Sequence, residues 1–149
     1  MNILVINGPN LNLLGIREPN IYQNQTYQEL VDFLNEYANC HNLNLEVFQS
    51  NHEGYIIDKL HEAYYQKFDG IIINPGAYTH YSYAIKDAIA SISIPTIEVH
   101  LSNIMERENW RRESVIRDVC ITNFMGEHFK SYQNALDYFI EQERANHAK

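Results

Sequence analysis

Two kinds of apolar pattern alternate along this chain. Five short runs that are mostly apolar, at residues 3–6, 43–48, 69–73, 96–100 and 119–122, are expected to form strands. Longer stretches between and after them, in which apolar residues recur every three or four positions, are expected to form helices. Alternating strands and helices predict an α/β fold, and we expect a doubly wound, five-stranded parallel sheet in the flavodoxin-like strand order 2-1-3-4-5.

Each predicted helix has one apolar face. Thr26 is expected to cap the first helix, with Glu29 completing a capping box, and Thr79 is expected to cap the third. The residues expected on the inner faces are Tyr27, Leu30, Val31, Leu34, Tyr37 and Ala38 in the first helix; Ile56, Ile57, Leu60 and Tyr64 in the second; Ile85, Ala88, Ile89 and Ile92 in the third; and Tyr132, Ala135, Leu136, Phe139 and Ile140 in the last.

Composition and charge limit the possible functions. A chain of 149 residues without a linker or repeat is expected to form a single domain over residues 1–149. Its formal net charge of −8 argues against a general nucleic-acid or anionic-membrane surface. Met1 leads directly into the first strand, with no targeting segment and no apolar run long enough to span a bilayer, so we expect a cytoplasmic protein. The two cysteines, Cys40 and Cys120, lack metal-type spacing and are interpreted as ordinary thiols.

The expected strand order brings the carboxyl ends of the first, third and fourth strands together. The loops that follow these strands carry Asn10, residues 74–80 and residues 100–102. Open α/β sheets bind their ligands at this edge. A binding crevice is therefore expected where the three loops converge.

The loop after the first strand contains a candidate general base. Arg17 precedes Tyr22 by five residues, and a nearby guanidinium favours the phenolate. A free tyrosine titrates near ~10, so its base form costs about 4 kcal/mol at neutral pH. A unit charge at ~4 Å, with an effective dielectric constant of ~20, returns roughly that amount. The alternative is that Tyr22 packs against the sheet and Arg17 is a solvated cation.

Two histidines and a turn are candidates to complete the site. His100 ends the fourth strand, and Glu98 points to the same side because strand side chains alternate, so Glu98 can orient or charge the imidazole. His80 lies on a neighbouring loop. A structural role is the alternative for such a histidine, and a metal pair is disfavoured because a third ligand at recognisable spacing is missing. The N–H groups of Leu101 and Ser102 form either an anion nest or an ordinary turn.

The arginine-rich segment 107–117 has two interpretations. Its interleaved acidic residues favour a solvated, mutually paired surface, and the alternative is that one arginine reaches inward to bind polar oxygens. Several other chemistries lack support, since the chain has no GxGxxG after the first strand, no P-loop and no GxSxG motif. All lysines fall on predicted helices or the tail, so a Schiff-base mechanism has no natural nucleophile.

Six ordered motifs resemble a known family over nearly the whole chain. They are NGPNLNLLG (7–15), REPxxY (17–22), QSNHEG (49–54), NPGAYTH (74–80), EVHLSN (98–103) and RExWR (107–111). In order and spacing they resemble type II 3-dehydroquinate dehydratase.

The resemblance implies a lyase that reversibly converts 3-dehydroquinate to 3-dehydroshikimate without a cofactor, in the shikimate pathway or in quinate breakdown. It implies that Tyr22 takes the C2 proton as a phenolate and that Arg17 favours this phenolate and closes a lid formed by about residues 15–25. Asn10 is implied to hold the resulting enolate through water. His100 is implied to protonate the departing C1 hydroxyl, in anti geometry and without an imine.

The resemblance also implies substrate binding by the converging loops and by a neighbouring subunit. Leu101 and Ser102 are implied to bind the substrate carboxylate through their backbone, and Arg111 to bind ring hydroxyls. Asp87 lies seven residues past His80, roughly 10 Å along a helix axis, so it is poorly placed for its own crevice. By resemblance it serves a neighbouring subunit, in a trimer that assembles into a dodecamer. The remaining implied binding residues are Asn74, Gly76 and His80.

The sequence departs from the family pattern in three places. Gln23 stands where glycine is usual, and Trp110 replaces the common phenylalanine. Residues 115–126 lack the usual small and glycine-rich residues and include Arg117. The first departure concerns the lid, the second is mild, and the third concerns the fifth strand and part of the subunit interface. None of them is a chemical position.

A rival interpretation keeps the same fold without the chemistry. The chain would then be a catalytically silent binding protein that holds a small carboxylate or phosphate. The complete set of Arg17, Tyr22 and His100 favours the enzyme, because a binding protein does not need a phenolate.

Overall fold

The computed structural model describes residues 1–16 and 25–148. It contains a five-stranded sheet in which all neighbours are parallel, with the order β2-β1-β3-β4-β5, and this confirms the predicted fold. The strands are β1 (Asn2–Asn7), β2 (Asn44–Gln49), β3 (Gly70–Asn74), β4 (Thr96–His100) and β5 (Thr122–Met125).

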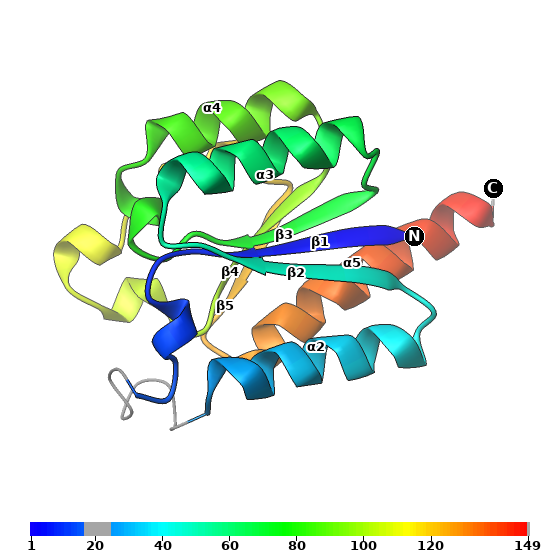
Figure 1. The fold of residues 1–149 in the computed structure, drawn as a ribbon, viewed down its shortest axis with the longest axis horizontal. Coiled ribbons are helices and arrows are strands. Elements are labelled where there is room, and N and C mark those ends of the chain that lie inside the picture. The colour runs from blue at the N-terminus through cyan, green and yellow to red at the C-terminus, as the bar shows by residue number, and fades with distance from the viewer. Residues whose placement is uncertain (17–24, 149) are drawn as a thin grey trace.

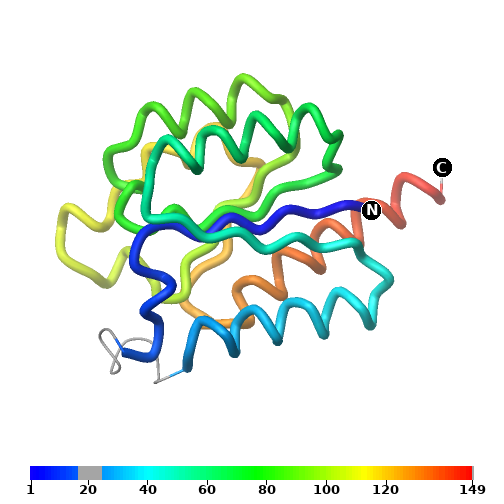
Figure 2. The backbone as a smooth tube through the Cα atoms, in the orientation of Figure 1, coloured from blue at the N-terminus to red at the C-terminus, as the bar shows by residue number. Residues whose placement is uncertain are grey.

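Helices cover both faces of the sheet (Figure 1). α3 (Glu53–Tyr65) and α4 (Tyr83–Ile92) lie on one face, and α2 (Tyr27–Cys40) and α5 (Phe129–His147) lie on the other. Parallel neighbours require crossover connections, and α2, α3 and α4 are part of them, whereas α5 follows the last strand. The N-terminus and the end of α5 lie at one edge of the sheet, and the loops that leave the carboxyl ends of the strands lie at the opposite edge (Figure 2).

The alternation of side chains along the central strands divides the core into two layers. Ile3 and Val5 pack in the layer of α2 and α5, whereas Leu4 and Ile6 pack in the layer of α3 and α4. All residues of β3 are buried, as expected for a parallel strand covered on both faces. The buried residues that confirm the predicted helix faces are Leu30, Leu34, Ala38, Ile56, Leu60, Ile85, Ala88, Ile89, Ile92, Tyr132, Ala135, Leu136, Phe139 and Ile140.

The helix caps agree with the sequence in one of two cases. Thr26 caps α2 as predicted, because its hydroxyl accepts a hydrogen bond from the Glu29 N–H at 3.1 Å. The prediction that Thr79 caps α4 is wrong. Ser82 is the cap, and its hydroxyl accepts from the Ile85 N–H at 3.1 Å. Thr79 is buried in the short 3-10 helix that precedes α4.

Two further details differ from the sequence prediction. Tyr64 is 54% exposed, and Ala63 takes the inner position on α3 that was expected for this tyrosine. The fifth strand begins at Thr122 instead of residue 119, because the 3-10 helix η5 (Arg117–Val119) occupies the start of the expected strand.

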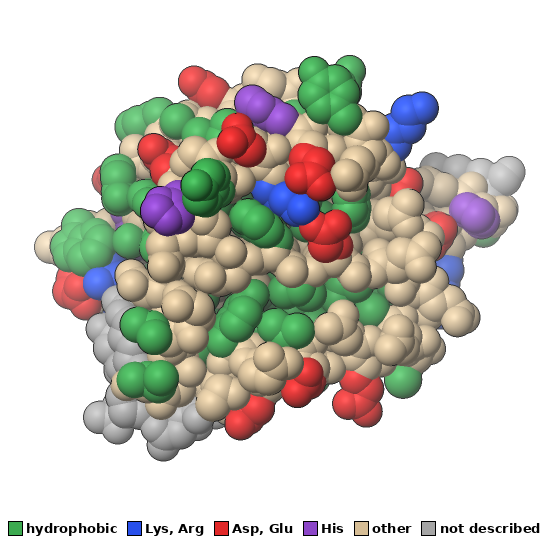
Figure 3. All heavy atoms as spheres, viewed as in Figure 1, with side chains coloured by type: hydrophobic (Ala, Val, Ile, Leu, Met, Phe, Trp, Pro, Cys, Tyr) green, Lys and Arg blue, Asp and Glu red, His purple; other side chains and the backbone are tan. Residues whose placement is uncertain are grey.

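The surface in Figure 3 carries more acidic than basic side chains, in keeping with the net charge of −8. None of the described helices is long and apolar enough to cross a membrane. Cys40 is exposed, Cys120 is half-buried, and both are free thiols.

Candidate active site

The carboxyl edge of the sheet holds a crevice lined by the three loops that were expected to converge. Its volume is about 540 Å³, including space open to solvent. The predicted site residues that line it are Asn10, Asn74, Gly76, His80, His100, Leu101, Ser102 and Arg111. Arg17 and Tyr22, with most of the expected lid, lie outside the described residues. Asp87 is exposed on α4 and does not line the crevice.

Two glycines allow the loops after β1 and β3 to approach each other closely. The Gly8 N–H donates to the Asn74 carbonyl at 2.8 Å. A Cβ atom at Gly8 would lie 2.4 Å from the Pro75 carbonyl oxygen, so a side chain is excluded there. Gly76 has φ +61, a backbone conformation that glycine adopts without steric cost. These glycines therefore fix one wall of the crevice.

The loop after β1 is held from β2 by side-chain amides. Gln49 Nε2 donates to the Gly8 carbonyl and to Asn51 Oδ1, each at 3.1 Å. Asn51 Oδ1 also accepts from the Asn10 N–H at 3.0 Å. Asn10 adopts the left-handed conformation with φ 70, which asparagine tolerates better than most residues. The motif around residues 49–54 thus orients Asn10 at the crevice.

The amide of Asn74 is anchored within the protein. Its Nδ2 donates to Tyr132 Oη at 2.9 Å, and its Oδ1 accepts from the Gly76 N–H at 3.2 Å. Tyr132 Oη in turn donates to Asn7 Oδ1 at 2.6 Å. Asn74 therefore shapes the loop that carries Gly76 as well as lining the crevice.

His100 is paired with a buried carboxylate, as the strand alternation predicted. Its Nε2 donates to Glu98 Oε2 at 2.6 Å, and Glu98 is fully buried. Burial alone raises the pKa of Glu98, but hydrogen bonds from His100 and Arg117 outweigh it and lower the pKa to about 2. A carboxylate at Glu98 fixes the proton on Nε2, so Nδ1 is the ring nitrogen of His100 that is left for a ligand.

The protein holds one ring nitrogen of His80 and leaves the second available to a ligand. Its Nδ1 donates to the Glu113 carbonyl at 2.6 Å, and its ring meets the Trp110 ring edge-on at 5.4 Å between centroids. Burial lowers the pKa of His80 more than the bond to Glu113 raises it. A neutral His80 with its proton on Nδ1 has Nε2 available to accept a hydrogen bond from a hydroxyl group.

The turn after β4 carries two backbone N–H groups and has a guanidinium nearby. Within the described part of the chain, the N–H groups of Leu101 and Ser102 donate to no backbone carbonyl. Arg107, which we did not single out from the sequence, also lines the crevice, and its Nη1 lies 3.4 Å from Ser102 Oγ. Arg107 is the first residue of the RExWR motif, and this position could have identified it from the sequence. Free N–H groups beside a guanidinium suit a carboxylate or phosphate.

Both interpretations of the arginine-rich segment apply, to different residues. Arg111 Nε pairs with Glu108 Oε2 at 2.8 Å, and its guanidinium lies 4.0 Å from the centre of the Trp110 ring. Arg117 instead reaches inward and donates to both carboxylate oxygens of Glu98. Among residues 1–16 and 25–148, no group of three or more His, Cys, Asp or Glu side chains is placed to hold a metal ion.

Comparisons with known proteins agree with one another. Residues 1–140 match the sequence profile of the family described as dehydroquinase class II. The 3-dehydroquinate dehydratase of Caldicellulosiruptor saccharolyticus is 60% identical over 134 residues, which cover 90% of this chain and 92% of that protein. The crystal structure of type II dehydroquinase from Butyrivibrio crossotus superposes with a TM-score of 0.92 at 59% identity, over 93% of this chain and 96% of that one. The type II dehydroquinase of Propionibacterium acnes superposes with a TM-score of 0.89 at 40% identity, over 93% and 94% of the two chains.

Proposed function

This chain belongs to the class II dehydroquinase family, and we propose that it is a lyase that reversibly dehydrates 3-dehydroquinate to 3-dehydroshikimate. The proposed reaction passes through an enolate and uses neither a cofactor nor a Schiff base. The observation that carries the proposal is the crevice itself. It brings an imidazole with a buried carboxylate partner close to the backbone N–H groups of Leu101 and Ser102 and to two arginines, Arg107 and Arg111. That chemistry suits a small, polyhydroxylated carboxylate.

The first proposed step removes the C2 proton of the substrate. Tyr22, as a phenolate favoured by the charge of Arg17, takes this proton, and the electron pair moves to the ketone oxygen to give an enolate. Asn10 holds the enolate oxygen through a water molecule. The roles of Arg17 and Tyr22 follow from the family resemblance. For Asn10, its position on the crevice wall adds support.

The second proposed step expels the C1 hydroxyl. Nδ1 of His100 carries the proton that the departing hydroxyl needs in order to leave as water, and the enolate collapses to the conjugated enone. Glu98 supports this role because its carboxylate holds Nε2 and stabilises the imidazolium. After this step Tyr22 holds the proton from C2 and His100 has lost a proton. Proton exchange with solvent returns both side chains to their starting protonation states.

The remaining crevice residues are proposed to bind the substrate. The N–H groups of Leu101 and Ser102 take the carboxylate. His80 accepts a hydrogen bond from a ring hydroxyl, and Arg111 donates to another. Asn74 and Gly76 form the wall against which the ring lies.

We also propose that the crevice is completed by a second copy of the chain. Asp87 is exposed on α4 and away from its own crevice, which supports a role in the site of a neighbouring subunit. The proposed assembly is a dodecamer built from trimers. We place the single-domain enzyme in the cytoplasm, in the shikimate pathway or in quinate breakdown.

The test is the ultraviolet absorbance of the conjugated enone after purified protein is mixed with 3-dehydroquinate, with and without a chelator. We expect enone formation that the chelator does not change. Absence of turnover, together with tight binding of a planar enolate mimic, would favour the silent binding protein instead.

A further inference from the structure

A buried charge cluster lies behind the crevice and contains an arginine that the proposed chemistry does not use. Glu98 Oε2 accepts from His100 Nε2 at 2.6 Å and from Arg117 Nη2 at 3.2 Å. Glu98 Oε1 accepts from Arg117 Nε at 3.0 Å. Since both cationic groups bind the same oxygen, their donor nitrogens lie no more than about 6 Å apart.

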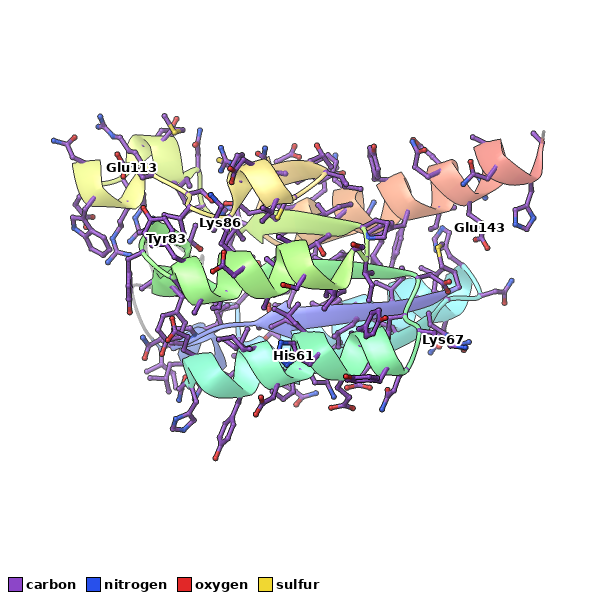
Figure 4. All side chains as sticks on the ribbon, turned by 90° about the horizontal axis from the view of Figure 1, so that it is seen from above. His61, Lys67, Tyr83, Lys86, Glu113 and Glu143 are labelled. Atoms are coloured by element: carbon purple, nitrogen blue, oxygen red, sulfur yellow. The ribbon has the colours of Figure 1, made fainter. Side chains whose placement is uncertain are left out.

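Arg117 reaches this carboxylate from outside the substrate crevice. It belongs to η5 and does not line the crevice. It lines a separate surface groove with Tyr83, Lys86 and Glu113, and 37% of its side chain is exposed there. Figure 4 labels these three neighbours around α4 and the segment beside it. Among the described residues, Glu98 is therefore the link between Arg117 and His100 at the crevice.

A second ion pair keeps the neighbouring carboxylate occupied. Asp118 follows Arg117 directly, and its Oδ2 lies 3.1 Å from Lys86 Nζ of α4. Because this lysine neutralises Asp118, the guanidinium of Arg117 is left to bind Glu98 through two hydrogen bonds. Arg117 lies in the stretch 115–126, where the sequence is expected to depart from the family pattern.

We propose that Arg117 is a positioning residue that tunes His100 as a proton donor by sharing the Glu98 carboxylate with it. The two hydrogen bonds hold Glu98 in the orientation that receives Nε2–H and turns Nδ1 towards the crevice. The guanidinium also offsets part of the carboxylate charge and places a positive charge near the His100 ring. This inference rests on the proposed function, because it concerns the residue that donates a proton in that reaction.

Other charged or titratable groups surround the pair, and the variants below leave them in place. The residues that pair with Glu98 and His100 on the neighbouring strands are Ile73, Asn123 and Met125, and all three are uncharged. Described titratable or charged groups on the elements packed around the pair include His80, Lys86, Arg107, Arg111, Asp118 and Cys120, together with Tyr132 and Tyr138 of α5, which packs against β4.

The test measures the titration of the His100 ring in the protein without substrate. Carbon-13-labelled histidine gives the ring signals, and the His100 signal is identified by its loss in His100→Gln. We expect Arg117→Met to move the midpoint of the His100 titration to higher pH by about one unit, because a like charge is removed. Arg117→Lys keeps the charge and is expected to stay within about a third of a unit of the original. Arg144→Met, which removes an exposed arginine from α5, is the charge-matched control and should leave the midpoint unchanged.

An unchanged or lower midpoint in Arg117→Met would overturn the proposal. A lower midpoint is the result expected if Arg117 did no more than order Glu98. The dehydration assay supplies the second readout: we expect the alkaline limb of kcat to move upward with the titration, while KM changes less than about threefold, since Arg117 does not line the crevice. A large rise in KM with kcat intact would also contradict it. If the unmodified protein does not dehydrate 3-dehydroquinate, the proposed function fails, and the ring titration still decides whether Arg117 controls His100.

Discussion

Replacing Glu98 by glutamine should make the protein less stable at neutral pH and less sensitive to acid. The pKa of this carboxyl falls from its ordinary value of 4.5 to about 2 in the folded protein, because the hydrogen bonds from His100 and Arg117 outweigh its burial. A difference of this size corresponds to about 3 kcal/mol of folding free energy. Since the pKa is lowered by folding, this contribution is fully present above about pH 4.5 and is lost as the pH falls through about 2. Glu98→Gln should therefore be about 3 kcal/mol less stable at pH 7, with a difference that vanishes near pH 2.

Urea unfolding followed by circular dichroism, at several pH values and one fixed protein concentration, measures this difference. Glu36→Gln is the matched control, because it removes an exposed carboxylate from α2 and should change the free energy of unfolding by less than about 0.5 kcal/mol. Equal stability of Glu98→Gln and the original protein at pH 7 would show that the Glu98 charge does not stabilise the fold. So would a loss of stability that persists undiminished at pH 2.

Three further predictions concern the loop wall, the subunit contact and the chemistry. Gly8→Ala should lose about 2 kcal/mol of stability in urea unfolding, because its Cβ would lie 2.4 Å from the Pro75 carbonyl oxygen. Gly54→Ala is the control and should not be destabilised, because nothing lies within 4 Å of its Cβ. Equal effects of the two substitutions would contradict the close approach at Gly8. Asp87→Ala should raise KM in the assembled protein, measured by kinetics alongside light scattering, and fully active isolated monomers would refute the shared site. Sodium borohydride added with substrate should leave activity intact, because none of the described residues that line the crevice is a lysine; inactivation with a matching mass increase would instead reveal a Schiff base.

The periodic parts of the fold were predictable because burial imposes them locally. The strands from β1 to β4 and the inner faces of the helices follow from spacing alone. The fifth strand was placed too early because Val119, Cys120 and Ile121 form a short apolar run. The backbone there forms η5, where Arg117 binds Glu98, and this contact spans 19 positions of sequence. Thr79 and Ser82 are both good helix caps by type, and the turn between them decides which one is used.

Part of the candidate site was also predictable, because parallel topology gathers the ends of neighbouring strands. The crevice and the pairing of Glu98 with His100 follow from strand order and side-chain alternation. The inward contact of Arg117 did not follow, since a surface-paired arginine and one that reaches a buried carboxylate look alike in sequence. The roles assigned to the residues that line the crevice stay predictions, as do those of Arg17 and Tyr22.

The sharpest test of Tyr22 as the general base compares enone formation by the original protein with that by Tyr22→Phe. We expect measurable dehydration of 3-dehydroquinate by the original protein and none by Tyr22→Phe, while affinity for a planar enolate mimic stays largely intact in the variant. A substantial rate in Tyr22→Phe would show that another group is the base.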